Sequence, residues 1–290
     1  MNLNHDNAAP FDMPDETDVE TQPKKKKKKS KIAVILLIVL LLACSGSLGY
    51  IGFTVITNKS AEAEYGEVNE IATRPAAETA ETPSASGQEQ NGYSPINLKK
   101  LRSINPDVYA WLRVPGTYVD YPVAQSAVDD NYYLHRNIYR RYLFAGMIYT
   151  QSCNAKDFLD PITVVYGHNM RSTTMFSSLH YFAKPDFFNK NEYFYIYTID
   201  RVLTYRIVSA YKYDDRHIMN SFNFYDPAVL AEYQKNILNP ASTLRNVRDG
   251  ITLDENSKIV ILSTCMSNDK KSRFLVNGVL ISDVPIQEEP

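Results

Sequence analysis

What the chain lacks removes several classes of function at the outset. Its 290 residues contain no internal repeat, no glycine-rich phosphate loop, no residues at metal-ligand spacing and no nucleic-acid motif. From Tyr93 to the end, 22 Lys and Arg stand against 20 Asp and Glu, so composition indicates no polyanionic partner. We therefore expect no metal, no cofactor and no nucleic-acid partner.

Charge is also absent from Ile32 to Ile56, an apolar stretch longer than the roughly 20 residues that a helix needs to cross a bilayer. Lysines 24–29 precede this stretch, and a run of acidic residues follows it. The positive-inside rule then predicts a cytoplasmic N-terminus and an extracytoplasmic remainder. The sequence thus predicts a single-pass protein of the cell membrane, with an acidic and polybasic tail over residues 1–31 and a transmembrane anchor over residues 32–57.

A lipoprotein processing site is the alternative for this region, because Leu41-Leu42-Ala43-Cys44 resembles one imperfectly. The apolar stretch continues past Cys44 to Ile56, which favours an uncleaved anchor. Residues 58–94 are rich in Ala, Glu, Thr, Ser and Pro, and we expect a disordered, solvated spacer there. The folded domain is expected over residues 95–285.

Short runs of Val, Ile, Tyr and Phe, most of them separated by Gly, Pro, Asn or Asp, predict a mainly β domain. The predicted strands are Ala110–Val114, Tyr118–Val123, Gly146–Thr150, Ile162–Tyr166, Tyr193–Thr198, Val202–Tyr213, Ile259–Ser263 and Phe274–Ile281. About eight strands with few long helices suggest a closed barrel or a sandwich.

Helices are expected at two places in this domain. Residues 96–110 carry a helical apolar pattern that Pro106 interrupts, which predicts two short helices before the first strand. Asp226 is a favourable N-cap and Pro227 suits the first helical position, so one longer helix is expected up to Leu238.

Only three cysteines are present, and Cys44 lies in the apolar stretch. Cys153 and Cys265 fall in the extracytoplasmic part, where disulfides can form. A Cys153–Cys265 bridge is one interpretation of this pair, although a domain of this size does not need one.

Cys265 also follows the apolar run Ile259–Leu262, after Ser263 and Thr264. A thiol of ordinary pKa, about 8.5, is mostly protonated at neutral pH, and a nearby cation such as Arg273 favours the thiolate. The alternatives are a buried, inert thiol and, for Arg273, a surface ion pair with Asp269.

A thiol nucleophile needs a proton-transfer partner, and His168 is the candidate that its context favours. It lies just past the predicted strand Ile162–Tyr166, as Cys265 lies just past its own strand. If these two strands are parallel neighbours, both side chains meet at one rim of the sheet. The other histidines of the domain have no such context, and we expect surface or hydrogen-bonded structural roles for His135, His180 and His217.

Two motifs resemble those of a sortase, and specifically of class B, the membrane-anchored cysteine transpeptidases of Gram-positive bacteria. They are Leu262-Ser-Thr-Cys265 with Arg273, and Tyr166-Gly-His-Asn-Met170 with Met175-Phe176 and Leu179. The resemblance covers residues 95–285. It implies an eight-stranded β-barrel with N-terminal helices and one long helix before the cysteine strand, all preceded by a single transmembrane helix.

The resemblance also implies a chemistry. Cys265 would attack the carbonyl of a threonine in the C-terminal sorting signal of a surface protein, giving a thioacyl enzyme. His168 would protonate the leaving amine and deprotonate the incoming one, and Arg273 would hold the substrate backbone and the oxyanion. Ser263 and Thr264 would line the substrate groove. The acceptor would be an amine of a peptidoglycan precursor or, alternatively, a pilin lysine.

Two residues depart from the class B pattern. Gln151 stands where many members carry an acidic residue, and Cys153 lies outside the pattern; neither receives a role. A hydrolytic cysteine protease and a catalytically silent, membrane-tethered binding domain are the rival functions. Specificity is expected in the segment Tyr211–Pro240, but no residue there encodes the sorting signal or the choice between wall anchoring and pilus assembly.

Overall fold

The computed structural model of the protein describes residues 31–73 and 94–286, in two units that divide at Tyr50 and Ile51. Helix α1 (Lys31–Ala72) begins in the first unit. Its segment Ala33–Phe53 is long and apolar enough to cross a membrane, by length and composition. The predicted apolar helix is therefore present, and residues 1–30 of the predicted tail, which was expected over residues 1–31, lie outside the described residues.

Helix α1 continues into the second unit as far as Ala72, where we had expected a spacer. Ala61, Tyr65, Val68 and Ala72 are all buried and follow one another at helical spacing, so they form one apolar stripe. The prediction of a solvated spacer is therefore wrong for residues 58–72, because this stripe packs into the domain's core. Residues 74–93, the rest of the expected spacer, lie outside the described residues.

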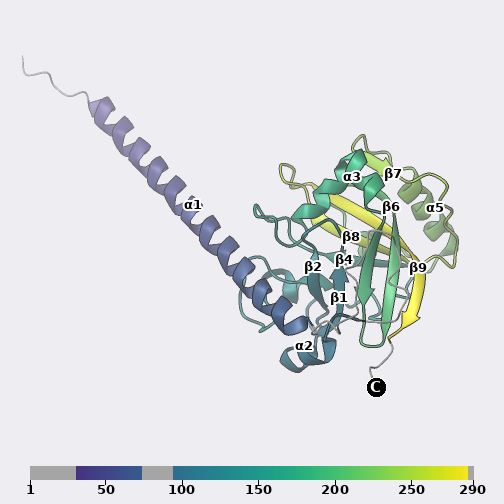
Figure 1. Cartoon of the computed structure of the whole chain (residues 1–290). Helices are drawn as coiled ribbons and strands as arrows, with labels where there is room; N and C mark the ends of the chain where they lie inside the picture. Colours follow the sequence, from purple (N-terminus) through teal and green to yellow (C-terminus); the bar gives the residue numbers. More distant parts are fainter. Residues whose placement is uncertain (1–30, 74–93, 287–290) are drawn as a thin grey trace, which may run out of the picture. The chain divides into compact units, whose positions relative to one another are not determined.

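The second unit is built around a β-barrel (Figure 1). Among the described residues its strands are β1 (Val108–Arg113), β2 (Asp120–Ala124), β3 (Ile148–Thr150), β4 (Ile162–Tyr166), β5 (Tyr193–Tyr197), β6 (Arg201–Asp214), β7 (Arg245–Val247), β8 (Ile259–Cys265) and β9 (Ser272–Pro285). Eight of them pair in the order β5-β1-β2-β3-β4-β8-β9-β6, and a β5–β6 pairing closes the ring. The ninth, β7, pairs with β6 outside this ring. The expected eight-stranded barrel is thus confirmed, and the open sandwich is not formed.

Strand β8 shows why the sequence marks the barrel wall so clearly. Val260 and Leu262 pack into the core cluster that the strands of the barrel share, while Ile259 and Ile261 pack on the opposite face. That outer face lies under α5 (Pro227–Leu238), whose Leu230, Tyr233 and Ile237 complete the second cluster. Because both faces are covered, the strand is a continuous apolar run rather than an alternating one. The predicted long helix is confirmed, with the Asp226 side chain accepting from the Ala228 amide.

The helical lead-in is shorter than predicted. Helix α2 (Leu98–Ile104) is present, but β1 begins at Val108, so the second short helix is not formed. Buried Asn105 ends α2: its Nδ2 donates to the Ile138 carbonyl at 3.0 Å and ties the chain to a distant loop. The remaining short helices are η1 (Tyr132–His135), η2 (Ser177–Ala183), α3 (Pro185–Lys190) and α4 (Ile218–Ser221).

Candidate active site

Two strand pairings bring the predicted site residues together. Strands β4 and β8 are parallel neighbours, with Tyr166 opposite Ser263. This is the arrangement in which we expected His168 and Cys265 to lie at one rim. His168 and Cys265 each follow two residues after this pair. Strand β9 runs antiparallel to β8 and places Arg273 directly opposite Cys265, a position in which side chains are close neighbours.

A pocket of about 250 Å³ opens at this end of the barrel. Cys265 is exposed, whereas Ser263 and Thr264 are only 5% and 2% exposed. All five sequence-predicted site residues line the pocket, together with Asn131, Leu134, Tyr149, Gln151, Tyr166, Gly167, Tyr213, Asp215, Arg216, His217 and Ile218. The wall from Tyr213 to Ile218 belongs to the segment in which we expected specificity.

The imidazole of His168 is held from three sides. Its Nε2 lies 2.9 Å from the Leu134 carbonyl oxygen, and its ring stacks on those of His135 and Phe144, with centroids 5.1 and 5.8 Å away. A carbonyl oxygen only accepts, so Nε2 carries a proton in both charge states and Nδ1 is the nitrogen that gains and loses one. Nδ1 is therefore the ring nitrogen of His168 that is available for proton exchange.

Burial lowers the pKa of His168 below its ordinary value. The hydrogen bond to Leu134 raises this pKa, and the electrostatic effect of His135 lowers it, so burial determines the direction of the shift. We expect an NMR titration of the full chain in detergent micelles to place the His168 midpoint below 6.5. In the unfolded chain His168 has the higher pKa, so the unfolded chain takes up this proton at a higher pH than the folded chain does. The contribution of His168 to the free energy of unfolding is therefore lost as the pH falls from 6.5 towards that midpoint. A midpoint at or above 6.5 would contradict the burial argument.

The backbone after Cys265 is fixed by two side chains that the sequence did not single out. Asn169 Nδ2 donates to the Cys265 carbonyl at 2.9 Å, and His180 Nε2 lies 3.1 Å from the same oxygen. Asn169 also donates to Ser267 Oγ at 3.0 Å. The segment after the His strand and the segment after the Cys strand are thereby tied together. The three other histidines thus surround the site, because His217 lines the pocket as well.

Arg273 does not form the ion pair that was its alternative role. Among the described residues, the Asp269 carboxylate pairs with Lys212 Nζ at 2.9 Å and accepts from Ser272 Oγ at 2.7 Å. These partners, Lys212 first, lower the pKa of Asp269 to about 2. The Arg273 Nη1 instead donates to the Lys270 and Ser272 carbonyls, both at 3.2 Å. The guanidinium thus lines the pocket without a carboxylate partner among the described residues.

Tyrosines form the buried side of the pocket. Burial, and after it the electrostatic effect of Cys265, raise the pKa of Tyr149 to about 12, and Arg273 opposes the shift, so these three groups share one electrostatic environment. The hydroxyls of Tyr166 and Thr264 are buried without a hydrogen-bond partner among the described residues. Buried hydroxyls are normally partnered, so the pocket wall retains unused hydrogen-bonding capacity.

Gln151 and Cys153 occupy different surroundings. Gln151 is buried in the pocket wall, where Gln125 Nε2 donates to its backbone carbonyl at 2.9 Å.

Asp215 is the one carboxylate among the residues that line the pocket around Cys265. Within the described part of the chain, no three His, Cys, Asp or Glu side chains gather in a way that could hold a metal ion.

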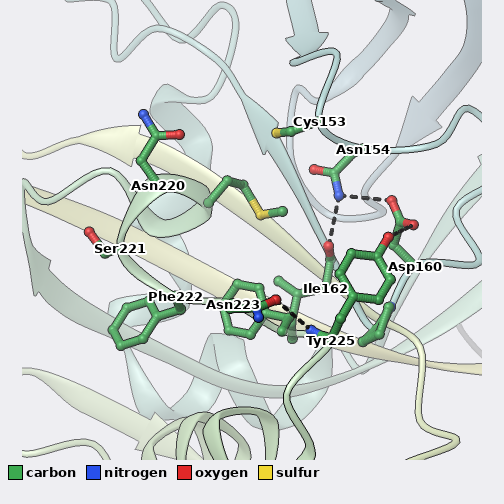
Figure 2. Close-up of a pocket in the computed structure, with 12 residues that line it drawn as sticks. Cys153, Asn154, Asp160, Ile162, Asn220, Ser221, Phe222, Asn223 and Tyr225 are labelled. Atoms are coloured by element: carbon green, nitrogen blue, oxygen red, sulfur yellow. Dashed lines mark hydrogen bonds between the residues drawn. The ribbon is translucent and has the colours of Figure 1, made fainter.

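Cys153 lies at a second, separate cavity of about 390 Å³ (Figure 2). The lining of this cavity includes no histidine, lysine or arginine, and burial raises the pKa of the Cys153 thiol. Figure 2 shows Asn154 and Tyr225 converging on Asp160, whose carboxylate accepts from both. The cavity is larger than the first, but its lining gives the thiol neither an imidazole nor a cation. Cys153 and Cys265 are both free thiols, so the bridge considered for them is not formed.

A closed barrel with a thiol, an imidazole and a guanidinium at one rim is the arrangement of a cysteine acyl-transfer enzyme. The family model for the sortase domain matches residues 112–281, more than half of the chain. The chain therefore belongs to the sortase family, whose members are cysteine transpeptidases.

The similar proteins belong to class B of this family. The sortase B of Listeria monocytogenes is 27% identical over 240 residues, covering 80% of this chain and 89% of that protein. The crystal structure of Clostridium perfringens sortase B is 34% identical, with a TM-score of 0.57 over 64% of this chain and all of that one. A Streptococcus pyogenes class B sortase involved in pilus biogenesis is 28% identical, with a TM-score of 0.55 over 64% of this chain and 98% of that one.

Proposed function

We propose that Cys265, His168 and Arg273 form the catalytic centre of this transpeptidase. The observation that carries the proposal is the strand register. Parallel pairing of β4 and β8 sets His168 and Cys265 at the same rim, and antiparallel pairing of β8 and β9 sets Arg273 opposite Cys265. Nucleophile, proton-transfer group and cation are thereby presented to one pocket.

In the first half-reaction the Cys265 sulfur attacks the carbonyl carbon of a threonine in the sorting signal of a surface protein. The Cys265 thiol proton passes to Nδ1 of His168, the S–C bond forms, the C–N bond to the next residue breaks, and His168 gives that Nδ1 proton to the leaving amine. In the second half, His168 takes a proton from an incoming amine, a new C–N bond forms and the thiolate leaves. The balance requires no oxidant, metal or cofactor.

Arg273 has two tasks in this scheme. Its guanidinium remains charged and presents several donors in a planar fork, which suits both peptide carbonyls and the tetrahedral oxyanion. The absence of a carboxylate partner among the described residues leaves that charge available. Ser263 and Thr264 line the groove beside it.

The N-terminal helix supports a location in the cell membrane. The apolar segment of α1 anchors the chain in the cell membrane with the N-terminus in the cytoplasm, and the catalytic domain faces the cell wall. The substrate is a secreted protein that carries a C-terminal sorting signal. The acceptor is an amine of a peptidoglycan precursor, so the enzyme anchors surface proteins to the wall. A pilin lysine is the second candidate acceptor, because a similar class B sortase is involved in pilus biogenesis.

Amine dependence tests this function. The full chain in detergent micelles is incubated with a set of sorting-signal peptides, with and without an added amine such as an oligoglycine or a lysine peptide. We expect a ligated product that appears only with the amine, because the thioacyl carbon is transferred to nitrogen. Cleavage at the same rate without the amine would indicate a hydrolytic protease, and the absence of any Cys265 adduct would indicate a binding domain.

A further inference from the structure

The buried part of α1 contacts the loop that holds His168. We call residues 61–72 of this helix the α1 brace. Three of its side chains hydrogen-bond to the loop over residues 137–146. Glu64 accepts from Asn137 Nδ2 at 2.8 Å, Glu67 accepts from the Tyr139 hydroxyl at 3.1 Å, and the Tyr65 hydroxyl donates to the Gly146 carbonyl. The brace lies outside residues 112–281, which the family model matches.

Tyr65 is the central residue of the brace. It is 4% exposed, and burial raises its pKa well above the usual value, so the hydroxyl stays a donor. Gly146, its acceptor, has φ +56°, and a β-carbon there would lie 2.2 Å from the Leu134 carbonyl oxygen. Gly146 thus packs directly against the oxygen that accepts from His168 Nε2. Tyr65 fixes this tight backbone contact from the helix side.

The ring of Tyr65 reaches a second support of the same histidine. It packs edge-on against Tyr121 with the centroids 5.0 Å apart, and the Tyr121 hydroxyl accepts from the Met175 amide at 3.0 Å. Met175 forms a bridge with Asn169, and the next amide, of Phe176, donates to the His168 carbonyl at 3.0 Å. One side chain of α1 therefore supports both the ring and the backbone of His168.

We propose that Tyr65 is a positioning residue for the catalytic histidine, and that the functional unit of this enzyme includes the α1 brace. The proposal rests on the role of His168 proposed above. Tyr65 acts by holding Gly146 against Leu134. This contact keeps the Nε2 proton of His168 hydrogen-bonded to the Leu134 carbonyl and leaves Nδ1 as the nitrogen that transfers a proton. The helix that precedes the domain is thus part of the catalytic apparatus as well as its tether.

The test compares Tyr65→Phe with Tyr139→Phe in the full chain in detergent micelles. Both changes remove one tyrosine hydroxyl from a hydrogen bond between α1 and the same loop, but the Tyr139 bond to Glu67 is exposed, whereas the Tyr65 bond to Gly146 is buried. For Tyr65→Phe we expect kcat to fall about tenfold, because small misplacements of a catalytic group cost rate strongly. KM for the sorting peptide should stay within about twofold, and Tyr139→Phe should match the wild type.

Histidine tautomers, read by ¹⁵N NMR with selective labelling at a pH above the His168 midpoint, supply a readout that loss of stability alone does not change. Wild type and Tyr139→Phe should show the Nε2–H form, whereas Tyr65→Phe should show a mixture with Nδ1–H. An unchanged kcat in Tyr65→Phe, or a lower kcat with an unchanged His168 tautomer, would contradict the proposal that Tyr65 positions His168. Full ligation by His168→Ala would instead overturn the proposed function, so the two failures are distinguishable.

Discussion

Replacing Cys265 by alanine is expected to abolish acyl transfer. Cys265 lies at the end of β8, where it is exposed to the pocket and opposite Arg273. Alanine keeps the strand but removes the atom that bonds to the acyl group, and no other cysteine lines the pocket. We expect ligation to fall by at least about 10⁴-fold, as it does when a nucleophile that acts with its base is removed. The full chain with sorting peptide and amine gives this ratio directly by chromatography of the products.

Cys153→Ala is the matched control for this experiment. Cys153 is the other thiol of the domain, but it lines a separate cavity without histidine or arginine, and burial raises its pKa. Its removal should leave the ligation rate within about twofold of the wild type, because thiol reactivity follows the thiolate fraction and access. The account would be contradicted if Cys265→Ala retained the activity and Cys153→Ala lost it.

Arg273→Ala is expected to lower kcat/KM by about 10²- to 10³-fold, equivalent to about 2.7–4 kcal/mol of lost transition-state stabilisation. The reason is that Arg273 is the cation opposite Cys265 and lines the pocket without a carboxylate partner among the described residues. Arg273→Lys keeps the charge but loses the planar fork, so we expect an intermediate rate. Steady-state kinetics with a sorting peptide and saturating amine measures both.

Lys212→Ala tests whether any nearby positive charge has the same effect. Lys212 pairs with Asp269, next to the turn that leads to Arg273, and does not line the pocket. Its loss should change kcat/KM by less than about threefold, since exposed ion pairs contribute little. If Arg273→Ala worked at the wild-type rate, Arg273 would not stabilise the oxyanion. If Arg273→Ala and Lys212→Ala lost the same amount of kcat/KM, Arg273 would act only as one of several nearby positive charges.

The barrel and the relation of its two central strands were predictable because the relevant signals are local. The run Ile259–Leu262 is apolar on both faces, and the small polar residues after it mark the approach to the exposed strand end at Cys265. The same pattern holds for β4, which ends at Tyr166. Strand ends are readable from sequence, so His168 and Cys265 could be placed at one rim once the strands were taken as parallel neighbours. Their chemical roles came from the family resemblance.

The supports of His168 were not predictable, because they depend on tertiary contacts. The Leu134 carbonyl is a backbone group and leaves no mark in the sequence. His135 and Phe144 come from a loop more than 20 residues before His168, and nothing in their spacing indicates that they stack on it. Strand β7 was missed because its three residues include no apolar pattern.

The α1 brace was missed for a different reason. Residues 58–72 are rich in Ala and Glu, which we took as the composition of a solvated spacer. Both are also strong helix formers, and a stripe of one Tyr, one Val and two Ala is sufficient to bury one face. Average composition conceals such a narrow stripe, whereas its helical spacing reveals it.

The most direct test of the account is a single-turnover measurement by intact-protein mass spectrometry. The full chain is mixed with an excess of sorting peptide without amine, and the acyl adduct on Cys265 is followed before and after amine is added. We predict an adduct that accumulates and persists in water, then disappears at a rate that rises with amine concentration as the ligated peptide forms. An adduct that decays equally fast without amine, or an enzyme that never forms one, would contradict the assignment of Cys265 as an acyl carrier.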